Sequence, residues 1–587
     1  MVRPCLVVMA MFSLTASTAS SSYAQQQPTS SATGDQTQQL AVPAVASEFR
    51  AQQKPLPELG RVGVDMDHQY PLTLREALSL ALENNKDIEV ARQNVRIAEF
   101  DLLGSRGAYD PRLITTSFYE RLENPISSFL SGGSNGSTTQ TDYTGTARLE
   151  GLLPKLGGSY HLDFSSIRLT TNNQFAALNP QYPTALTFNY TQPLLRGLKF
   201  DNSRRQIEIA RKNLSLTDAQ FRQRAIETIT NVQRAYWDLV FALKNLQIQR
   251  DAVRDARSQL EHNKRMVAEG QLAPIDIVAA EAQISGFEQS VFSALEEVSR
   301  TENNLKNLIA VNRQSELWSE SIVPTDAVEL VVPVISLTDS LKTAMENRPE
   351  LQQSTVAKEI NEIDQRYFRE QEKPAVDLVG SYGIVGLAGT LSSGVNPLTA
   401  SSVQLRDAVN RLLVNSGFDA LPPPPAQTIS PELIGSYAQS IQNLAANRFS
   451  NFRVGVQINL PLRNRTAEAQ FGRAIVEGQR IATQREQLEQ TIQVDVRNAL
   501  QSMRSAEARL RAAVAARDAS EQQYTSEQRK LEAGQSTVFL VLERQTALTT
   551  ARGNELRAQT DLNKSIAELQ RATGNALQIN SVVVRVH

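Results

Sequence analysis

The strongest constraint on this chain is a helix-reversing turn that occurs twice. The first copy reads Met-Val-Ala-Glu-Gly-Gln-Leu-Ala-Pro over 266–274, and the second reads Leu-Glu-Ala-Gly-Gln-Ser over 531–536. Gly270 and Gly534 lie 264 positions apart. Each suits the end of a helix, because glycine adopts a positive φ without a Cβ clash. Pro274 suits the first turn of the helix that follows. The sequence therefore predicts two antiparallel helix pairs.

The turns are flanked by very long helical patterns. Residues 203–266 contain no proline and carry apolar residues at heptad spacing, which is typical of a helix that packs along its whole length in a left-handed coiled coil. About 64 residues form a rod of roughly 95 Å. The heptad positions are Ile229, Val232, Tyr236, Leu239, Leu243, Leu246 and Val253. Similar patterns cover 274–309, 466–531 and the stretch from the second turn to about residue 573.

The duplicated turn belongs to a tandem repeat. Residues 335–351 align with 72–88 without gaps at an offset of 263, and Leu74/Leu337 and Asn84/Asn347 are identical pairs. In the first copy a helix is predicted from residue 74 to about 103, with Thr73 as its N-cap. With only two long copies, the pattern indicates a duplication and not a solenoid.

Each repeat carries strand-like runs between its first helix and its long helix. In the first repeat these are 112–121, 142–152, 159–170 and 185–192. Pro193 closes the last run before the long helix, and Pro461 is its counterpart in the second repeat. Residues 387–449, an insert with four consecutive prolines, are predicted to form a mobile or decorative loop.

The N-terminal residues predict export. Arg3, a short apolar run and the small residues Ser22 and Ala24 together indicate a cleaved secretory signal peptide over 1–24. The next stretch, 25–64, is rich in Gln, Ser, Thr and Pro and is predicted to be a flexible leader. Cys5 is the sole cysteine, so the mature chain is expected to have neither disulfides nor thiol catalysis.

Composition and motifs exclude several classes of function. Lys and Arg number 60 against 62 Asp and Glu, a net charge of −2, which gives no reason to expect a nucleic-acid partner. The four histidines are scattered, and neither a metal site nor a cofactor site is expected. Residues 132–136 formally fit the nucleophile-elbow pattern, but they lie in a loop with no helix after it. We expect no enzyme.

A membrane location would require strands. No stretch beyond the signal approaches the roughly 18–20 apolar residues of a transmembrane helix, and β-strands are the other structure that satisfies its own backbone in lipid. Each repeat begins and ends in helix with an even number of strands between, so both helical ends lie on one side of the strands. An open-edged sheet cannot sit in lipid, and joining the strands of several chains into one barrel resolves this.

The order of these elements resembles one known family. The chain has a helix, strands ending in Gln-Pro-Leu-Leu-Arg-Gly over 192–197, a long helix, a glycine turn and a second helix, and this order is duplicated behind a signal peptide. From Pro71 to the C-terminus, the arrangement resembles the TolC family of outer membrane efflux proteins. The resemblance implies an α+β membrane protein that forms a homotrimer, with a β-barrel in outer membrane lipid and an α-helical coiled-coil tunnel across the periplasm. It also implies the exit duct of a tripartite efflux or type I secretion system, with a periplasmic adaptor and an inner membrane transporter as partners.

The predicted organisation follows from the repeat and the resemblance. Its parts are the signal peptide (1–24), the flexible leader (25–64), the first structural repeat (65–310), an equatorial connection (311–334), the second structural repeat (335–574, with the insert 387–449) and a C-terminal equatorial segment (575–587).

The resemblance also implies a gate at the helix tips. Gly270 and Gly534 would mark the periplasmic tips, Asp276 matches an acidic partner of the links that close the family's entrance, and Glu543 matches an acid that lines its constriction. The chain has Leu540 at the second constriction position and Ser536 where an arginine is usual. We therefore expect the gate to close by other contacts. Both acids also fit plain structural roles, as a helix-dipole partner and a solvated helix charge.

A second reading stays open at this stage, namely a periplasmic coiled-coil scaffold or adaptor whose strands form a soluble sandwich. The outward face of the strands distinguishes a membrane barrel from a soluble sandwich, because only a barrel needs apolar lipid-facing positions with aromatic girdles. The candidate girdle residues are Phe118, Tyr119, Phe188 and Tyr190. The transported cargo is open, with drugs, metal ions, polysaccharides and proteins as alternatives.

Overall fold

The computed structural model describes residues 60–126, 132–133, 136–328, 332–392, 397–422 and 429–582. The predicted signal peptide and nearly all of the predicted leader lie outside these residues. So do two residues of the 132–136 motif and the last five residues of the expected C-terminal segment.

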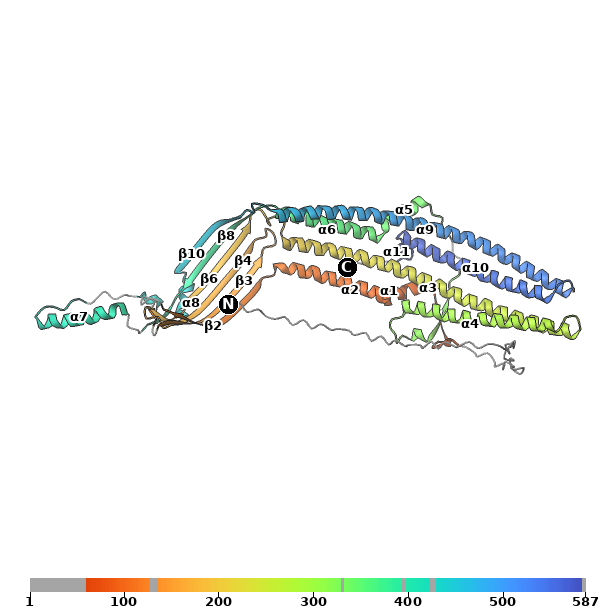
Figure 1. Cartoon of the computed structure of the whole chain (residues 1–587), viewed down its shortest axis with the longest axis horizontal. Coiled ribbons are helices and arrows are strands. Elements are labelled where there is room, and N and C mark those ends of the chain that lie inside the picture. Colours follow the sequence, from red (N-terminus) through yellow and green to blue (C-terminus); the bar gives the residue numbers. More distant parts are fainter. Residues whose placement is uncertain are drawn as a thin grey trace, which may run out of the picture. The chain divides into compact units, whose positions relative to one another are not determined.

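Four long helices confirm the predicted pairs. They are α3 (Asn202–Ala268), α4 (Ile275–Ile309), α9 (Arg465–Glu532) and α10 (Val538–Ala572). Toward the turns they lie abreast in the order α4, α3, α10, α9 (Figure 1). None of the helices in the described ranges is both long enough and apolar enough to cross a membrane.

The seam between the long helices is the predicted heptad stripe. Ile229, Val232 and Leu239 of α3 are fully buried against α4 and the C-terminal part of the chain. Tyr236 and Trp237 are buried as well, with their rings perpendicular and 5.4 Å apart, so this aromatic pair serves packing. The Tyr236 hydroxyl donates to Asp326 over 2.6 Å, and burial and this bond together raise the pKa of Tyr236.

The helix predicted over 74–103 is broken into two. α1 (Leu74–Asn84) and α2 (Lys86–Arg106) meet at Asn85, which is extended (φ −62°, ψ 130°). Its side chain accepts from the N–H groups of Asp87 and Ile88, so it caps α2. Thr73 caps α1 as predicted, accepting from Glu76 over 3.1 Å. Local side-chain capping therefore overrides the continuous helical pattern.

The second repeat has the same break, 263 positions on. Arg348 separates α5 (Leu337–Asn347) from α6 (Pro349–Gln371). Each break residue also binds the C-terminal end of another helix. Asn85 Nδ2 donates to Leu308 O of α4 over 3.2 Å, and Arg348 Nη1 donates to Ala572 O of α10 over 3.4 Å. These bonds satisfy carbonyls that the helix itself leaves free. α4 therefore continues the line of α1 and α2, and α10 that of α5 and α6.

One antiparallel sheet lies at the other end of the long helices. Its long strands follow the order β10, β8, β6, β4, β3, β2. Their bounds are β2 (Arg112–Pro125), β3 (Ser137–Leu152), β4 (Ser159–Thr171), β6 (Thr184–Pro193), β8 (Ala375–Gly386) and β10 (Phe449–Asn459). The four strands predicted in the first repeat are confirmed, with ends shifted by a few residues. Next to the sheet four helices lie abreast in the order α2, α3, α6, α9 (Figure 1).

The insert 387–449 contains more structure than a loop. It includes β9 (Gly389–Leu391), α7 (Pro397–Asn415) and α8 (Tyr437–Ala445), and the short β5 (Leu178–Gln181) of the first repeat pairs with β9. α8 is fixed to the sheet by buried polar contacts. Ser440 Oγ lies 2.9 Å from Thr184 Oγ1, and Asn443 Nδ2 donates to Leu387 O over 2.9 Å. The prediction of a merely mobile or decorative loop is therefore wrong for this part.

A small parallel sheet packs against α3 and α4. β1 (Asp65–Leu72) pairs with β7 (Glu320–Pro324), which lies in the predicted equatorial connection. A buried ion cluster holds it to α4. Glu302 accepts from Arg61 Nη1 over 2.8 Å and from the Ile322 N–H over 2.8 Å, and Lys306 Nζ lies 3.6 Å from it. Arg61 belongs to the last part of the predicted leader, so the folded region begins before residue 64.

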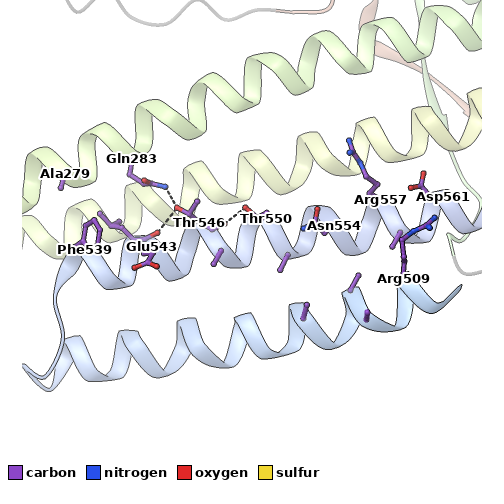
Figure 2. A pocket seen from close by; sticks show the side chains of 17 residues that line it. Ala279, Gln283, Arg509, Phe539, Glu543, Thr546, Thr550, Asn554, Arg557 and Asp561 are labelled. Atoms are coloured by element: carbon purple, nitrogen blue, oxygen red, sulfur yellow. Dashed lines mark hydrogen bonds between the residues drawn. The ribbon is translucent and has the colours of Figure 1, made fainter. Parts of the chain in front are cut away.

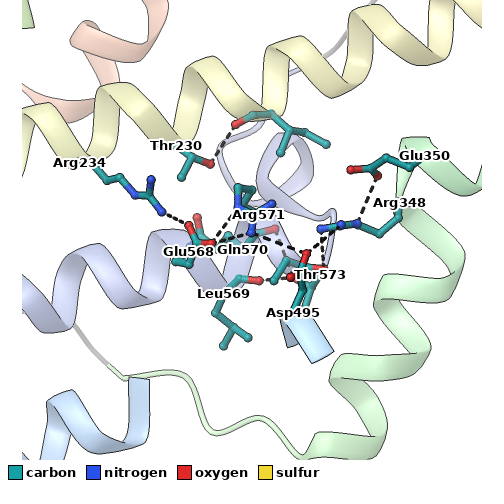
Figure 3. Close-up of polar contacts among 12 residues, drawn as sticks. Thr230, Arg234, Arg348, Glu350, Asp495, Glu568, Leu569, Gln570, Arg571 and Thr573 are labelled. Atoms are coloured by element: carbon teal, nitrogen blue, oxygen red, sulfur yellow. Dashed lines mark hydrogen bonds and ion pairs between the residues drawn. The ribbon is translucent and has the colours of Figure 1, made fainter. Parts of the chain in front are cut away.

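A second ionic network joins the two repeats at the same level (Figure 3). Arg348 lies 3.3 Å from Asp495 of α9 and 3.2 Å from Glu350, while Arg571 of α10 binds Glu568 over 2.6 Å. Glu568 also pairs with Arg234 of α3. The network therefore connects four helices that come from both halves of the chain.

The Glu302 cluster gives a stability prediction. Glu302→Ala leaves Arg61 and Lys306 buried without their carboxylate, and we expect the free energy of unfolding to fall by about 3–5 kcal/mol. Thermal melting of the helical circular dichroism signal in detergent measures this as a lower Tm. Glu296→Ala, at an exposed position of the same helix, is the control and should melt like the parent. Equal melting of both variants would contradict a supporting role for the cluster.

Candidate functional site

The predicted strand-to-helix junctions lie where the sheet meets the helices. β6 ends at Pro193, and Leu194 N–H adds a last bond to Val376 O over 2.7 Å. Pro461 follows β10, four residues before α9 begins. Asn464, at the start of α9, donates from Nδ2 to Gln371 O over 3.1 Å. At these junctions a backbone bond extends the sheet past Pro193, and a side-chain bond joins the start of α9 to the end of α6.

The sheet has one apolar face. Residues directly opposite in neighbouring strands share a face, so the register assigns every side chain. The apolar face is formed by Tyr119, Tyr143, Leu149, Tyr160, Leu162, Phe164, Leu186, Phe188, Tyr190, Val376, Leu378, Tyr382, Ile384, Phe452, Val454, Val456 and Ile458. Of the four candidate girdle residues, Tyr119, Phe188 and Tyr190 lie on it. Phe118 pairs with Thr144 on the other face, because a strand alternates its sides at each residue.

The opposite face is polar. Arg148 Nε lies 2.5 Å from Asp163 Oδ1, and His161 Nε2 lies 3.5 Å from the other oxygen of the same carboxylate. Near the helix end of the sheet, Arg112 pairs with Glu150 over 3.3 Å. An apolar and a charged face on one sheet are what a wall between lipid and water requires.

The first predicted tip is a glycine-terminated helix end. Gly270 has φ +73°, and nothing lies within 4 Å of where its Cβ would be, so the backbone conformation alone explains the glycine. Gln271 N–H bonds to Met266 O over 2.9 Å, and Gly270 N–H bonds to Val267 O over 3.0 Å. This pair of bonds is a Schellman motif, which satisfies the last carbonyls of α3.

The second tip repeats this geometry. Gly534 has φ +70°, its N–H bonds to Leu531 O over 3.0 Å, and Gln535 N–H bonds to Lys530 O over 2.8 Å. Thr537 then caps α10 by accepting from the Leu540 N–H over 3.4 Å. The prediction of one backbone device used twice is confirmed.

The polar groups of the tips bind within their own hairpins. Asp276 Oδ2 accepts from the Ala273 N–H over 3.2 Å at the start of α4. Ser536 donates to Glu527 of α9, and this hydrogen bond, with Lys530 beside it, holds the pKa of Glu527 below its usual value. Asp276 and Ser536 thus each have a partner in their own turn.

An apolar cluster connects the two tips instead. Leu531, Val538, Val541 and Leu542 are buried at the second turn, and Leu272 of the first turn packs against them, together with Tyr524. We name this group the tip cluster. Leu531 is 3% exposed. Apolar burial therefore links the two tips within one chain.

A groove of about 1150 Å³ runs beside the tip cluster between α4, α9 and α10 (Figure 2). Gln283 Nε2 of α4 donates to Thr546 Oγ1 of α10 over 2.7 Å at its wall. Glu543 and Phe539 lie at one end, and Arg509 and Arg557 at the other. Glu543 is exposed to solvent, whereas Leu540, the other predicted constriction position, is half-buried.

Sequence comparison identifies the family. The profile of the family described as outer membrane efflux protein matches residues 145–311 and 429–575, more than half of the chain. The chain belongs to this family. It is therefore an outer membrane channel that serves as the exit duct of efflux pumps, with a helical extension in the periplasm. No curated protein matches the sequence.

Solved structures share the fold. The outer-membrane channel OprN superposes with a TM-score of 0.57 at 14% identity, covering 87% of this chain and 94% of that one. The Campylobacter jejuni CmeC outer membrane channel gives 0.56 at 14%, covering 86% of each chain. The open state of the Neisseria gonorrhoeae MtrE outer membrane channel gives 0.53 at 16%, covering 86% and 89%. These likenesses confirm the predicted fold class.

The tip cluster gives a prediction about local structure. Leu272→Ala removes about three methylene-sized groups from a partly buried contact and should weaken the link between the tips by about 1–2 kcal/mol. Spin labels at residues 271 and 535 should then report a broader distance distribution. Ile275→Ala, on the same turn but 68% exposed, should leave the distribution unchanged. Identical distributions in both variants would show that the cluster does not hold the tips together.

Proposed function

We propose that three copies of this chain form the duct, with the sheets closing into a barrel in the outer membrane and the helices forming a tunnel below it. The observation that carries the proposal is the two-faced sheet with two open edges. β2 and β10 are exposed along their whole length, and unpaired strand edges are not tolerated in lipid. The two edges run in opposite directions, so β10 of one copy can pair with β2 of the next and the ring can close.

The same face pattern argues against a soluble sandwich. In a sandwich the apolar face would be covered by a second sheet. Here large side chains on that face remain exposed, Phe452 by 75% and Ile458 by 66%. Lipid is the partner that suits such a face.

We further propose how the ends of the duct are used. The tips at Gly270 and Gly534 form the periplasmic entrance, where a periplasmic adaptor and an inner membrane transporter deliver the cargo of a tripartite efflux or type I secretion system. The signal peptide 1–24 directs export, and the two repeats with their equatorial segments form one continuous wall. Glu543 lines the entrance, and the tip cluster holds each chain's two tips together when the entrance is closed.

Cell fractionation tests the trimer. The proposal predicts a heat-modifiable trimer in the outer membrane fraction, because a closed barrel with an apolar outer face resists detergent until it is heated. Deletion of the gene should cause hypersensitivity to toxic compounds or loss of secretion. Recovery of the protein as a soluble periplasmic monomer would contradict the proposal and favour the scaffold reading.

Recording from single channels tests the entrance residues. Glu543→Gln should lower the cation-to-anion permeability ratio by about twofold, because a ring of carboxylates at a constriction favours cations. Glu486→Gln, at an exposed position of α9 far from the tips, is the matched control. Asp276→Ala addresses the latch in the same recordings, and unchanged conductance would exclude Asp276 as a latch. An unaltered permeability ratio in Glu543→Gln would place that acid outside the pore.

A further inference from the structure

The two repeats contribute different numbers of strands. Pro111 aligns with Pro374 and Pro193 with Pro461, so β2 corresponds to β8 and β6 to β10. The hairpin of β3 and β4 has no counterpart among the described residues of the second repeat. Building on the proposed trimer, we propose that this hairpin is part of the membrane wall. Six strands from each of three chains then make a barrel of eighteen.

Every one of the six strands is long enough for this role. They contain 14, 16, 13, 10, 12 and 11 residues from β2 to β10. A tilted strand needs about 9–11 residues to cross the hydrocarbon layer. The short strands β5 and β9, with 4 and 3 residues, do not reach this length.

The hairpin also has the two faces of the other strands. Leu149 and Leu162 are opposite each other on the apolar face. On the polar face, the carboxylate of Asp163 binds Arg148 and accepts from Asn189 Nδ2 of β6 over 3.5 Å. A hairpin folded outside the wall would have no reason to keep this alternation and to accept a hydrogen bond from β6.

The turn of the hairpin, between β3 and β4, is fixed to the junction of the sheet with the helices. In the turn after β3, Leu156 O accepts from Gln192 Nε2 over 2.8 Å, and Pro154 O accepts from Arg204 Nε over 3.2 Å. A Cβ on Gly157 would lie 2.6 Å from Gly197 O, so glycine is needed for this close approach. The hairpin therefore extends over the full height of the sheet.

The width of the helical layer fits six strands. Four helices abreast at 8–10 Å spacing occupy roughly 32–40 Å of the circumference per chain. Strands about 4.8 Å apart and tilted by about 40° occupy roughly 6.3 Å each, so six cover about 37 Å and four only about 25 Å. With the hairpin, the sheet and the helical layer match without an abrupt change of radius.

The extra hairpin sets the bore of the outer end. Eighteen strands at this tilt enclose a ring of about 36 Å diameter between backbones, against about 24 Å for twelve. A barrel this wide leaves an aqueous channel. Selection of cargo then falls to the tips and not to the membrane wall.

Cysteine cross-linking between copies tests whether β2 and β10 close the ring, and an electron cryomicroscopy map then counts the strands. Leu113 of β2 and Ile458 of β10 are exposed, lie on the apolar face and stand one residue inside the helix-side ends of their strands. In a Cys5→Ser background, Leu113→Cys with Ile458→Cys should form covalent dimers and trimers with a short bismaleimide. The control pair Tyr160→Cys with Ile458→Cys tests β4 as the edge strand instead. Its yield of cross-linked product should be about tenfold lower, because only cysteines on adjacent strands lie close enough for the reagent.

The outcomes separate the strand count from the trimer itself. Cross-linking through Tyr160 and not through Leu113, or twelve strands in an electron cryomicroscopy map of the purified trimer, would overturn the eighteen-stranded barrel and leave the duct standing. A trimer without cross-links in either pair would also overturn edge-to-edge closure by β2. Absence of any trimer on gel filtration of the parent protein would instead refute the proposed function on which this inference rests.

Discussion

The unpaired backbone groups along β2 and β10 are the constraint from which the rest of the structure follows. A single chain has no means of satisfying them in lipid, where each free N–H or C=O costs several kcal/mol. Among the described residues, large side chains on the apolar face of the same sheet, such as Phe452 and Ile458, stay exposed. Closure with other copies satisfies both demands at once. The positions of α3 and α9 then follow from those of β6 and β10, because each of these strands leads directly into one of the two helices.

The duplication builds this wall from two copies of one helical arrangement. α3 and α9 run unbroken over 67 and 68 residues, while the shorter helices are placed end to end beside them. Asn85 and Arg348 occupy equivalent breaks and use different side chains to bind the end of the next helix. The architecture therefore depends on where the backbone breaks more than on the residue type that stands there.

The sequence was sufficient for the features that local physics determines. The heptad stripe, the glycine turns and the four strands of the first repeat follow from periodicity and from the φ preference of glycine. The break at Asn85 could have been found, since Pro349 aligns one residue after it and proline favours the first turn of a helix. The absence of a hairpin from the described part of the second repeat was not readable, because the aligned prolines lie 82 positions apart in the first repeat and 87 in the second. α8 was not readable either, because its nine residues are ordered by contacts with Thr184, which lies more than 250 positions away.

In the candidate gate, too, local features were predictable from the sequence and contacts between distant segments were not. Gly270 and Gly534 were predictable, but the tip cluster depends on Leu272 meeting side chains from the other repeat. The charged residues of the sequence pointed to Asp276 instead, and its carboxylate accepts a hydrogen bond from Ala273 in the same turn. No periodicity within one helix encodes a contact between two hairpins. Only the packed structure places Leu272 against Leu531.

The seam itself changes character toward the tips. Near the equatorial level it is built from fully buried apolar residues such as Ile229 and Leu239. Toward the tips it contains the buried amides of Asn263 and Gln545, and within the described ranges Asn263 Nδ2 and both amide atoms of Gln545 have no hydrogen-bond partner. Each such group costs about 1–3 kcal/mol. Gln233 and Gln570 carry such unpaired oxygens near the equatorial level as well, and at the tips the buried apolar side chains of the tip cluster offset this cost.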